Sequence, residues 1–136
     1  MTAAHPLGRL ETFALIGIGG FAGSNLRYFA LGLLSDLQAV LLVNVLGCFV
    51  LGFLVYEAEY TDYIERESRI VFTTGFLSSL TTYSTFAIQT ATAAEPLVLI
   101  AIVAGNYGLG FASVLASRTL ARRLRDRTST VGGETA

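Results

Sequence analysis

The chain has 136 residues, of which 53% are hydrophobic and only 14% are charged, and its formal net charge is −1. A soluble domain carries about 25% charged residues, so this composition excludes an ordinary water-soluble domain and favours an integral membrane protein. With one histidine and one cysteine, the chain offers no nucleophile–base pair and no cluster of metal-binding side chains, so we do not expect an enzyme.

Four apolar segments follow one another along the chain. They span residues 10–30, 37–56, 70–91 and 97–117. Each is close to the roughly 20 residues that a helix needs to cross the hydrocarbon of a bilayer. The sequence therefore predicts an all-α integral membrane protein in which residues 1–136 form one domain of four transmembrane helices. We expect residues 118–136 to form a basic and then disordered tail.

Glycines recur within these segments at spacings that favour close helix packing. Small residues let two helix backbones approach each other in lipid, where no hydrophobic effect drives helices together. The glycines that we expect to serve this role are Gly19, Gly23, Gly47, Gly52, Gly108 and Gly110. They predict a compact assembly.

Three polar side chains of the segments are not explained by packing. Arg27 lies near the end of the first segment, Asn44 lies early in the second, and Asn106 lies in the fourth. Polar groups inside a membrane are energetically expensive and typically face a partner or a water-filled path. The alternatives are that each amide caps a neighbouring helix carbonyl and that Arg27 extends to the membrane interface.

The third segment contains the stretch GFLSSLTTYSTF, residues 75–86, which is rich in hydroxyl groups. Such hydroxyls can bond to the carbonyls of their own helix and loosen it, and Gly75 reduces its regularity further. We therefore predict that the third helix is broken, which a membrane tolerates only where the break is buried or lines a cavity. Tyr83 and Phe86 are three residues apart and share a helical face, so their electropositive ring edges can face an anion.

No carboxylate lies deep in any of the four segments, since Glu11, Asp36 and Glu95 all fall at segment ends. A proton-coupled antiporter usually needs an acidic side chain inside the membrane. The neutral donors, ring edges and carbonyls of the segments instead favour passive movement of a small anion.

The basic residues are distributed very unevenly. With four spans, the N-terminus, the loop between the second and third spans, and the C-terminus share one side of the membrane. Eight of the nine basic residues lie on that side: Arg9, Arg66, Arg69, Arg118, Arg122, Arg123, Arg125 and Arg127. The positive-inside rule then places both termini in the cytoplasm. We expect the tail arginines to contact anionic lipid and not nucleic acid, and the acidic loop after the second span to be a solvated helical connection.

Three motifs, in order, resemble those of the Fluc (CrcB) family of fluoride channels. GGFAGSNLRY resembles that family's G-G-x-x-G-A-x-x-R-Y, VNVLGCFVLG its V-N-x-x-G-x-F-x-x-G, and GFLSSLTTYSTF its G-F-x-G-G-x-T-T-F-S-T-F. The resemblance implies a fluoride-selective passive channel in the plasma membrane that exports cytoplasmic fluoride and reduces its toxicity. It also implies an antiparallel, dual-topology dimer with two pores and a central structural sodium ion.

The resemblance also assigns roles to individual residues. It implies a pore lined by Asn44, Tyr83, Ser84, Thr85, Phe86 and Asn106, a vestibule containing Arg27, and a sodium ion held by the backbone carbonyls of Ser78 and Thr81.

Three positions depart from the family pattern. The paired glycines of the third motif are Ser78 and Ser79 here, the first phenylalanine is Tyr83, and the span-four tyrosine position is Ile102. The phenol of Tyr83 either adds a donor for fluoride or narrows the pore.

The basic bias also bears on the dimer. An inverted homodimer needs a chain that inserts both ways, so a chain with a fixed orientation pairs with an oppositely oriented paralogue. Two alternatives stay open: a non-conducting structural subunit of a heterodimeric channel, and a proton-coupled exporter of the small multidrug resistance type.

Overall fold

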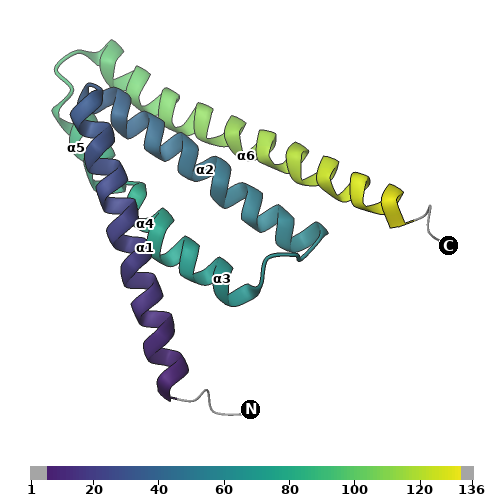
Figure 1. Cartoon of the computed structure of the whole chain (residues 1–136). Coiled ribbons are helices and arrows are strands. Elements are labelled where there is room, and N and C mark those ends of the chain that lie inside the picture. Colours follow the sequence, from purple (N-terminus) through teal and green to yellow (C-terminus); the bar gives the residue numbers. More distant parts are fainter. Residues whose placement is uncertain (1–5, 133–136) are drawn as a thin grey trace.

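The computed structural model describes residues 6–132, and every element within that range is helical (Figure 1). The elements in chain order are α1 (Pro6–Leu33), α2 (Asp36–Tyr60), α3 (Arg66–Val71), the π-helical turn η1 (Phe72–Leu77), α4 (Ser78–Leu80), α5 (Tyr83–Thr92) and α6 (Pro96–Gly132). The third predicted segment is thus divided among several short pieces, while the other three segments lie in continuous helices.

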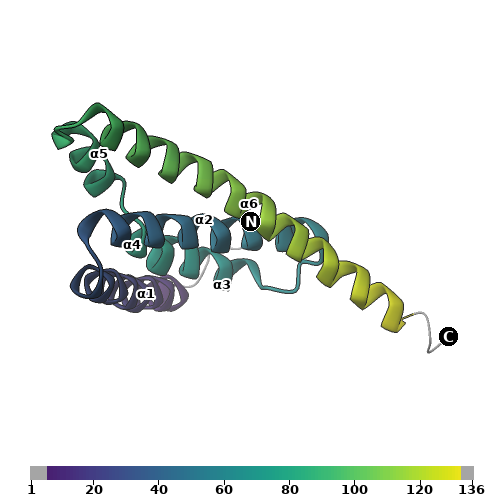
Figure 2. The ribbon, with the colours of Figure 1, turned by 90° about the horizontal axis from the view of Figure 1, so that it is seen from above.

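Helix α2 occupies the middle of the structure. It runs alongside α6 on one side, while α1 packs against η1 and α4 on the other (Figures 1 and 2). The start of α1, the α2–α3 loop and the far end of α6 lie toward one end of the molecule, and the two remaining connections lie at the opposite end (Figure 1). The basic residues of these segments therefore gather at one end.

The contact between α1 and η1 depends on glycine. A Cβ atom on Gly23 would lie 2.3 Å from the Phe76 carbonyl oxygen, and a Cβ atom on Gly75 would lie 2.6 Å from the Ile16 carbonyl oxygen. Both distances are too short for any side chain, so the prediction of close helix packing at Gly23 is confirmed. No atom of the described chain lies within 4 Å of a Cβ placed on Gly108, so packing at Gly108 stays a prediction.

Large apolar side chains cover much of the molecular surface. Phe13, Phe21, Tyr28 and Phe111 are each exposed over 69–78% of their area. Soluble monomers rarely carry extensive apolar patches, so this surface is typical of a protein that meets lipid or a partner chain.

Within the described residues, α2 and α6 are the helices long and apolar enough to cross a membrane. Glycines together with Ser24, Asn25 and Arg27 lower the hydropathy of α1, and the interruptions divide the third segment into shorter helices. The arrangement of four spans stays a prediction.

The loop between α2 and α3 is held by a buried carboxylate. Glu57 is only 6% exposed, and its Oε1 accepts the N–H groups of Tyr63 at 2.6 Å and Ile64 at 3.1 Å. Its Oε2 lies 3.4 Å from Arg69 Nη2, which also contacts Asp62 at 2.9 Å. The expected solvated helical connection is observed in part: Asp62, Tyr63 and Glu65 are exposed, but residues 61–65 are not helical and Glu57 is buried.

The tail differs from its prediction in one respect. Helix α6 continues to Gly132, so residues 128–132, which we expected to be disordered, are helical. Alanine, leucine and arginine, which dominate residues 118–125, are strong helix formers, and extending an existing helix by a few residues requires no new nucleation. The predicted disorder of residues 133–136 lies outside the described residues.

Candidate functional site

The third segment breaks at Thr81 and Thr82. Both residues adopt extended backbone angles, φ −77° and ψ 159° for Thr81 and φ −147° and ψ 116° for Thr82. Helix α5 begins directly afterwards, and the Thr82 hydroxyl caps it by accepting the N–H of Thr85 at 3.2 Å. The structure thus contains the interruption that the sequence predicts for this segment.

Hydroxyl groups before the break bond back to their own helix, as predicted. Thr73 Oγ1 donates to the Arg69 carbonyl at 2.8 Å, and Thr81 Oγ1 donates to the Leu77 carbonyl at 2.9 Å. The Ser78 hydroxyl donates to the Thr74 carbonyl. These bonds compete with the regular helical pattern, which explains why residues 72–82 pass through a π-helical turn and then an extended pair.

Asn44 holds the break from the neighbouring helix α2. Its Oδ1 accepts the N–H of Thr82 at 2.9 Å, and its Nδ2 donates to the Thr82 carbonyl at 3.2 Å. The same Nδ2 donates to Oδ1 of Asn106 at 3.2 Å, and Asn106 in turn donates to the Ile102 carbonyl at 2.9 Å. Asn44 therefore satisfies both backbone groups of Thr82. The side-chain amides of Asn44 and Asn106 each bond a backbone carbonyl, which is the capping role given above as the alternative.

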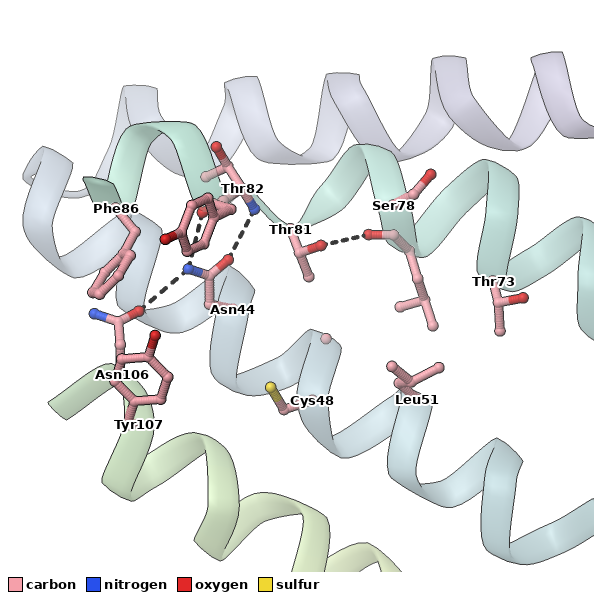
Figure 3. A pocket seen from close by; sticks show the side chains of 13 residues that line it. Asn44, Cys48, Leu51, Thr73, Ser78, Thr81, Thr82, Phe86, Asn106 and Tyr107 are labelled. Carbon is pink, nitrogen blue, oxygen red and sulfur yellow. Dashed lines mark hydrogen bonds between the residues drawn. The ribbon is translucent and has the colours of Figure 1, made fainter. Parts of the chain in front are cut away.

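A groove of about 450 Å³ runs along the break, between α2, η1, α5 and α6 (Figure 3). It is lined by Asn44, Gly47, Cys48, Leu51, Thr73, Leu77, Ser78, Thr81, Thr82, Tyr83, Phe86, Asn106 and Tyr107. None of these thirteen residues is charged. The groove is a mostly apolar surface with amide and hydroxyl groups along it.

Three aromatic rings form one end of the groove. The Tyr83 and Phe86 ring centroids are 5.9 Å apart and tilted by 48°, which confirms that they share a helical face. The Phe86 and Tyr107 centroids are 5.8 Å apart and nearly perpendicular, at 86°. Tyr83 is 76% exposed and Tyr107 is 53% exposed, whereas Phe86 is buried. Sequence reasoning missed Tyr107, although its place directly after Asn106 is a signal that could have found it.

Ser84 and Thr85 do not line the groove. Their hydroxyls lie 3.3 Å and 2.9 Å from the Thr82 hydroxyl, so the three form a small hydroxyl cluster at the start of α5. In this chain the cluster stabilises the helix start, and the pore-lining role implied for Ser84 and Thr85 stays a prediction.

Arg27 reaches the break from α1. Its Nη1 donates to the Thr81 carbonyl at 3.3 Å, so its guanidinium lies against the break in the third segment. The Ser78 carbonyl lacks its regular helical donor, because the N–H of Thr82 is bonded to Asn44 instead. Unwound carbonyls of this kind are the oxygen atoms that hold sodium in broken membrane helices. The Ser78 carbonyl is therefore a candidate sodium ligand, whereas the Thr81 carbonyl already accepts a hydrogen bond from the positively charged Arg27.

Comparison with known proteins identifies relatives along most of the chain. The family described as "CrcB-like protein, Camphor Resistance (CrcB)" matches residues 14–118. The chain is 51% identical over 122 residues to the fluoride-specific ion channel FluC 1 of Haloarcula marismortui, covering 90% of this chain and 94% of that protein. It is 44% identical over 111 residues to FluC 1 of Natronomonas pharaonis, which covers 80% of this chain and 92% of that protein. It is 36% identical over 118 residues to FluC 2 of Methanosarcina mazei, which covers 87% of this chain and 93% of that protein. The match spans the helices that build the groove, and this chain belongs to the CrcB family.

Proposed function

We propose that this chain is a fluoride-selective passive channel that lets fluoride leave the cytoplasm and so reduces its toxicity. The observation that carries the proposal is the uncharged groove beside the helix break, with aromatic rings and amides along it. The proposal agrees with the relatives, which are named fluoride-specific ion channels. An ion channel performs no covalent chemistry, so the chain is not an enzyme.

The chemistry of the groove suits a small anion that must bind and leave quickly. Ring edges of Tyr83, Phe86 and Tyr107 are electropositive and attract an anion without the fixed positive charge that would trap it. Both amide donations of Asn44 already go to protein oxygens. The phenol hydroxyls and the Asn106 amide are therefore the donors that we expect fluoride to meet first.

The absence of a carboxylate from the groove lining bears on the alternatives. A proton-coupled exporter needs an acidic group that alternates between a proton and its substrate. Neither the described groove nor the family favours that alternative. The family does not favour a purely structural subunit either.

We further propose that two chains of opposite orientation form the conducting unit, each with four transmembrane helices. The large exposed areas of Tyr83 and Tyr107 support this, because a second chain would cover them and complete the wall of the pore. The basic end of the molecule would lie in the cytoplasm, with both termini, in the plasma membrane. The partner is either a second copy inserted the other way or an oppositely oriented paralogue, and the charge bias, which favours a single orientation for each chain, favours the paralogue.

The sodium ion is part of the same proposal. The carbonyls of Ser78 and Thr81, next to the end of α4, would hold it at the centre of the dimer, where the negative end of a helix favours a cation. We expect higher thermal stability of the purified channel in sodium than in N-methyl-D-glucamine at equal ionic strength. Equal thermal stability in the two cations would show that the channel binds no structural sodium ion.

A growth assay tests the proposed function. A fluoride-sensitive bacterial strain that lacks its own fluoride exporter is given this chain alone, the chain with a paralogue from the same source, or an empty vector. The proposal predicts growth in fluoride-containing medium for at least one of the first two strains. Failure of both, with the protein present in the membrane, would contradict it.

A further inference from the structure

Arginine and tyrosine side chains form a second cluster at the basic end of the molecule, far along α2 and α6 from the groove. The Tyr60 hydroxyl oxygen accepts Nε–H of Arg118 at 3.4 Å and Nε–H of Arg122 at 3.1 Å. The Arg118 guanidinium lies 5.5 Å from the Tyr56 ring centroid, and those of Arg122 and Arg125 lie 5.8 Å and 5.1 Å from that of Tyr60. We call these five residues the arginine–tyrosine cluster.

Two positive charges in this cluster converge on one neutral oxygen. Among the described residues, no carboxylate lies within ion-pair distance of Arg118 or Arg122, whereas Arg69 has two and Arg125 has one. The two guanidiniums lower the pKa of the Tyr60 phenol from its ordinary value, through their hydrogen bonds first. Neighbouring like charges are unfavourable without an anion, and the terminal N–H groups of a guanidinium suit the paired oxygens of a phosphate.

The position of the cluster indicates where such a phosphate would come from. Arg118 follows directly after the apolar part of α6, and Leu120 and Leu124 on the same helix are 41% and 43% exposed. Tyrosine rings beside arginines at the end of a membrane helix are typical of the headgroup region. Apolar side chains next to fixed guanidiniums match a ligand with both acyl chains and a phosphate.

We propose that the arginine–tyrosine cluster binds the phosphate of an anionic lipid headgroup in the cytoplasmic leaflet. Tyr60 acts as a positioning residue, because its hydroxyl accepts Nε–H of both Arg118 and Arg122 and so holds the two guanidiniums together. The bound lipid would join the ends of α2 and α6. The proposal rests on the membrane insertion of the proposed function and is independent of what the groove conducts.

A lipid titration of the full chain tests this proposal. The protein in uncharged detergent is titrated with phosphatidylglycerol or with phosphatidylcholine, and bound lipid is counted by native mass spectrometry. The test variant is R118Q/R122Q. The matched control is R9Q/R66Q, which removes two positive charges from the same end of the molecule but outside the cluster. An arginine near an anionic surface changes binding by about fivefold, so we expect the test variant to bind phosphatidylglycerol at least about tenfold more weakly.

The other arms of the experiment separate the remaining explanations. We expect Y60F, which keeps the ring but loses the shared oxygen, to weaken binding to an intermediate degree. Equal weakening by the test and control variants, or no preference for phosphatidylglycerol, would overturn the proposal. Displacement of the lipid by inorganic phosphate at a similar concentration would also overturn it, because the site would then take a soluble anion. Fluoride flux of R118Q/R122Q in phosphatidylcholine liposomes reports separately on the proposed function.

Discussion

Replacing Gly47 by alanine tests whether the position of the helix break is set by contact with α2. A Cβ atom there would lie 2.1 Å from Cγ2 of Thr81, whereas carbon atoms in normal contact are about 3.5–4.0 Å apart. Thr81 does not turn away easily, because its side chain is β-branched and its hydroxyl bonds the Leu77 carbonyl at 2.9 Å. Overpacking typically costs about 1–3 kcal/mol, and alanine regains about 1 kcal/mol over glycine within a helix.

We therefore expect Gly47→Ala to lose up to about 2 kcal/mol of stability, the difference between these two effects. We also expect it to lower fluoride efflux, because a displaced Thr81 moves the neighbouring Thr82 away from Asn44. Thermal unfolding in detergent and efflux from liposomes measure the two effects. The matched control is Gly108→Ala, where no atom lies within 4 Å of the added Cβ.

A second substitution makes the test specific. Thr81→Ser removes Cγ2 and keeps the hydroxyl, and the next Thr81 atom, Cβ, lies at an ordinary 3.6 Å from the added Cβ. The double variant Gly47→Ala with Thr81→Ser should regain most of the lost stability and flux. The reasoning is refuted if Gly47→Ala is as stable as Gly108→Ala, or if Thr81→Ser does not restore it.

Three further predictions concern charged and polar groups. Asn44→Asp should reduce fluoride flux by roughly a thousandfold, since two like charges about 4 Å apart repel by about 4 kcal/mol at an effective dielectric constant near 20; unchanged flux would remove Asn44 from the pathway. Glu57→Ala should destabilise the chain by about 1–3 kcal/mol, because it leaves the loop N–H groups of Tyr63 and Ile64 without their acceptor. The exposed Glu59→Ala is its control, and similar unfolding midpoints for the two would contradict the role of Glu57. The lowered pKa of Tyr60 means that its phenol ionises before ordinary tyrosines. The ionised Tyr60 phenolate stabilises the folded chain. This stabilisation is fully present above the ordinary tyrosine pKa and is lost as the pH falls through the lowered pKa of Tyr60. Subtracting the ultraviolet titration of Tyr60→Phe should isolate an early transition, which Arg118→Gln shifts to higher pH.

The features of the groove that sequence could predict are local ones. The density of hydroxyls in residues 75–86 indicates a loosened helix, and the structure breaks it at Thr81 and Thr82. The spacing of Tyr83 and Phe86 places both rings on one face, as observed. Each of these inferences needs only the geometry of one helix.

The features that sequence could not predict depend on distant contacts. Arg27 and Thr81 are separated by 54 positions, so only the packing of α1 shows that the guanidinium bonds the Thr81 carbonyl. Tyr107 reaches Phe86 because of the rotation of α6. The sequence predicts a solvated loop around Glu57, and only the folded loop shows that Glu57 is buried against backbone N–H groups.

Fluoride efflux from liposomes that contain the purified chain tests the central claim most directly. An ion-selective electrode follows fluoride, and the same liposomes loaded with chloride are the control. The account predicts rapid fluoride loss without chloride loss, from the chain alone if it forms homodimers or after addition of its paralogue if it does not. Equal loss of both anions, or no fluoride loss from folded protein with the paralogue present, would contradict it.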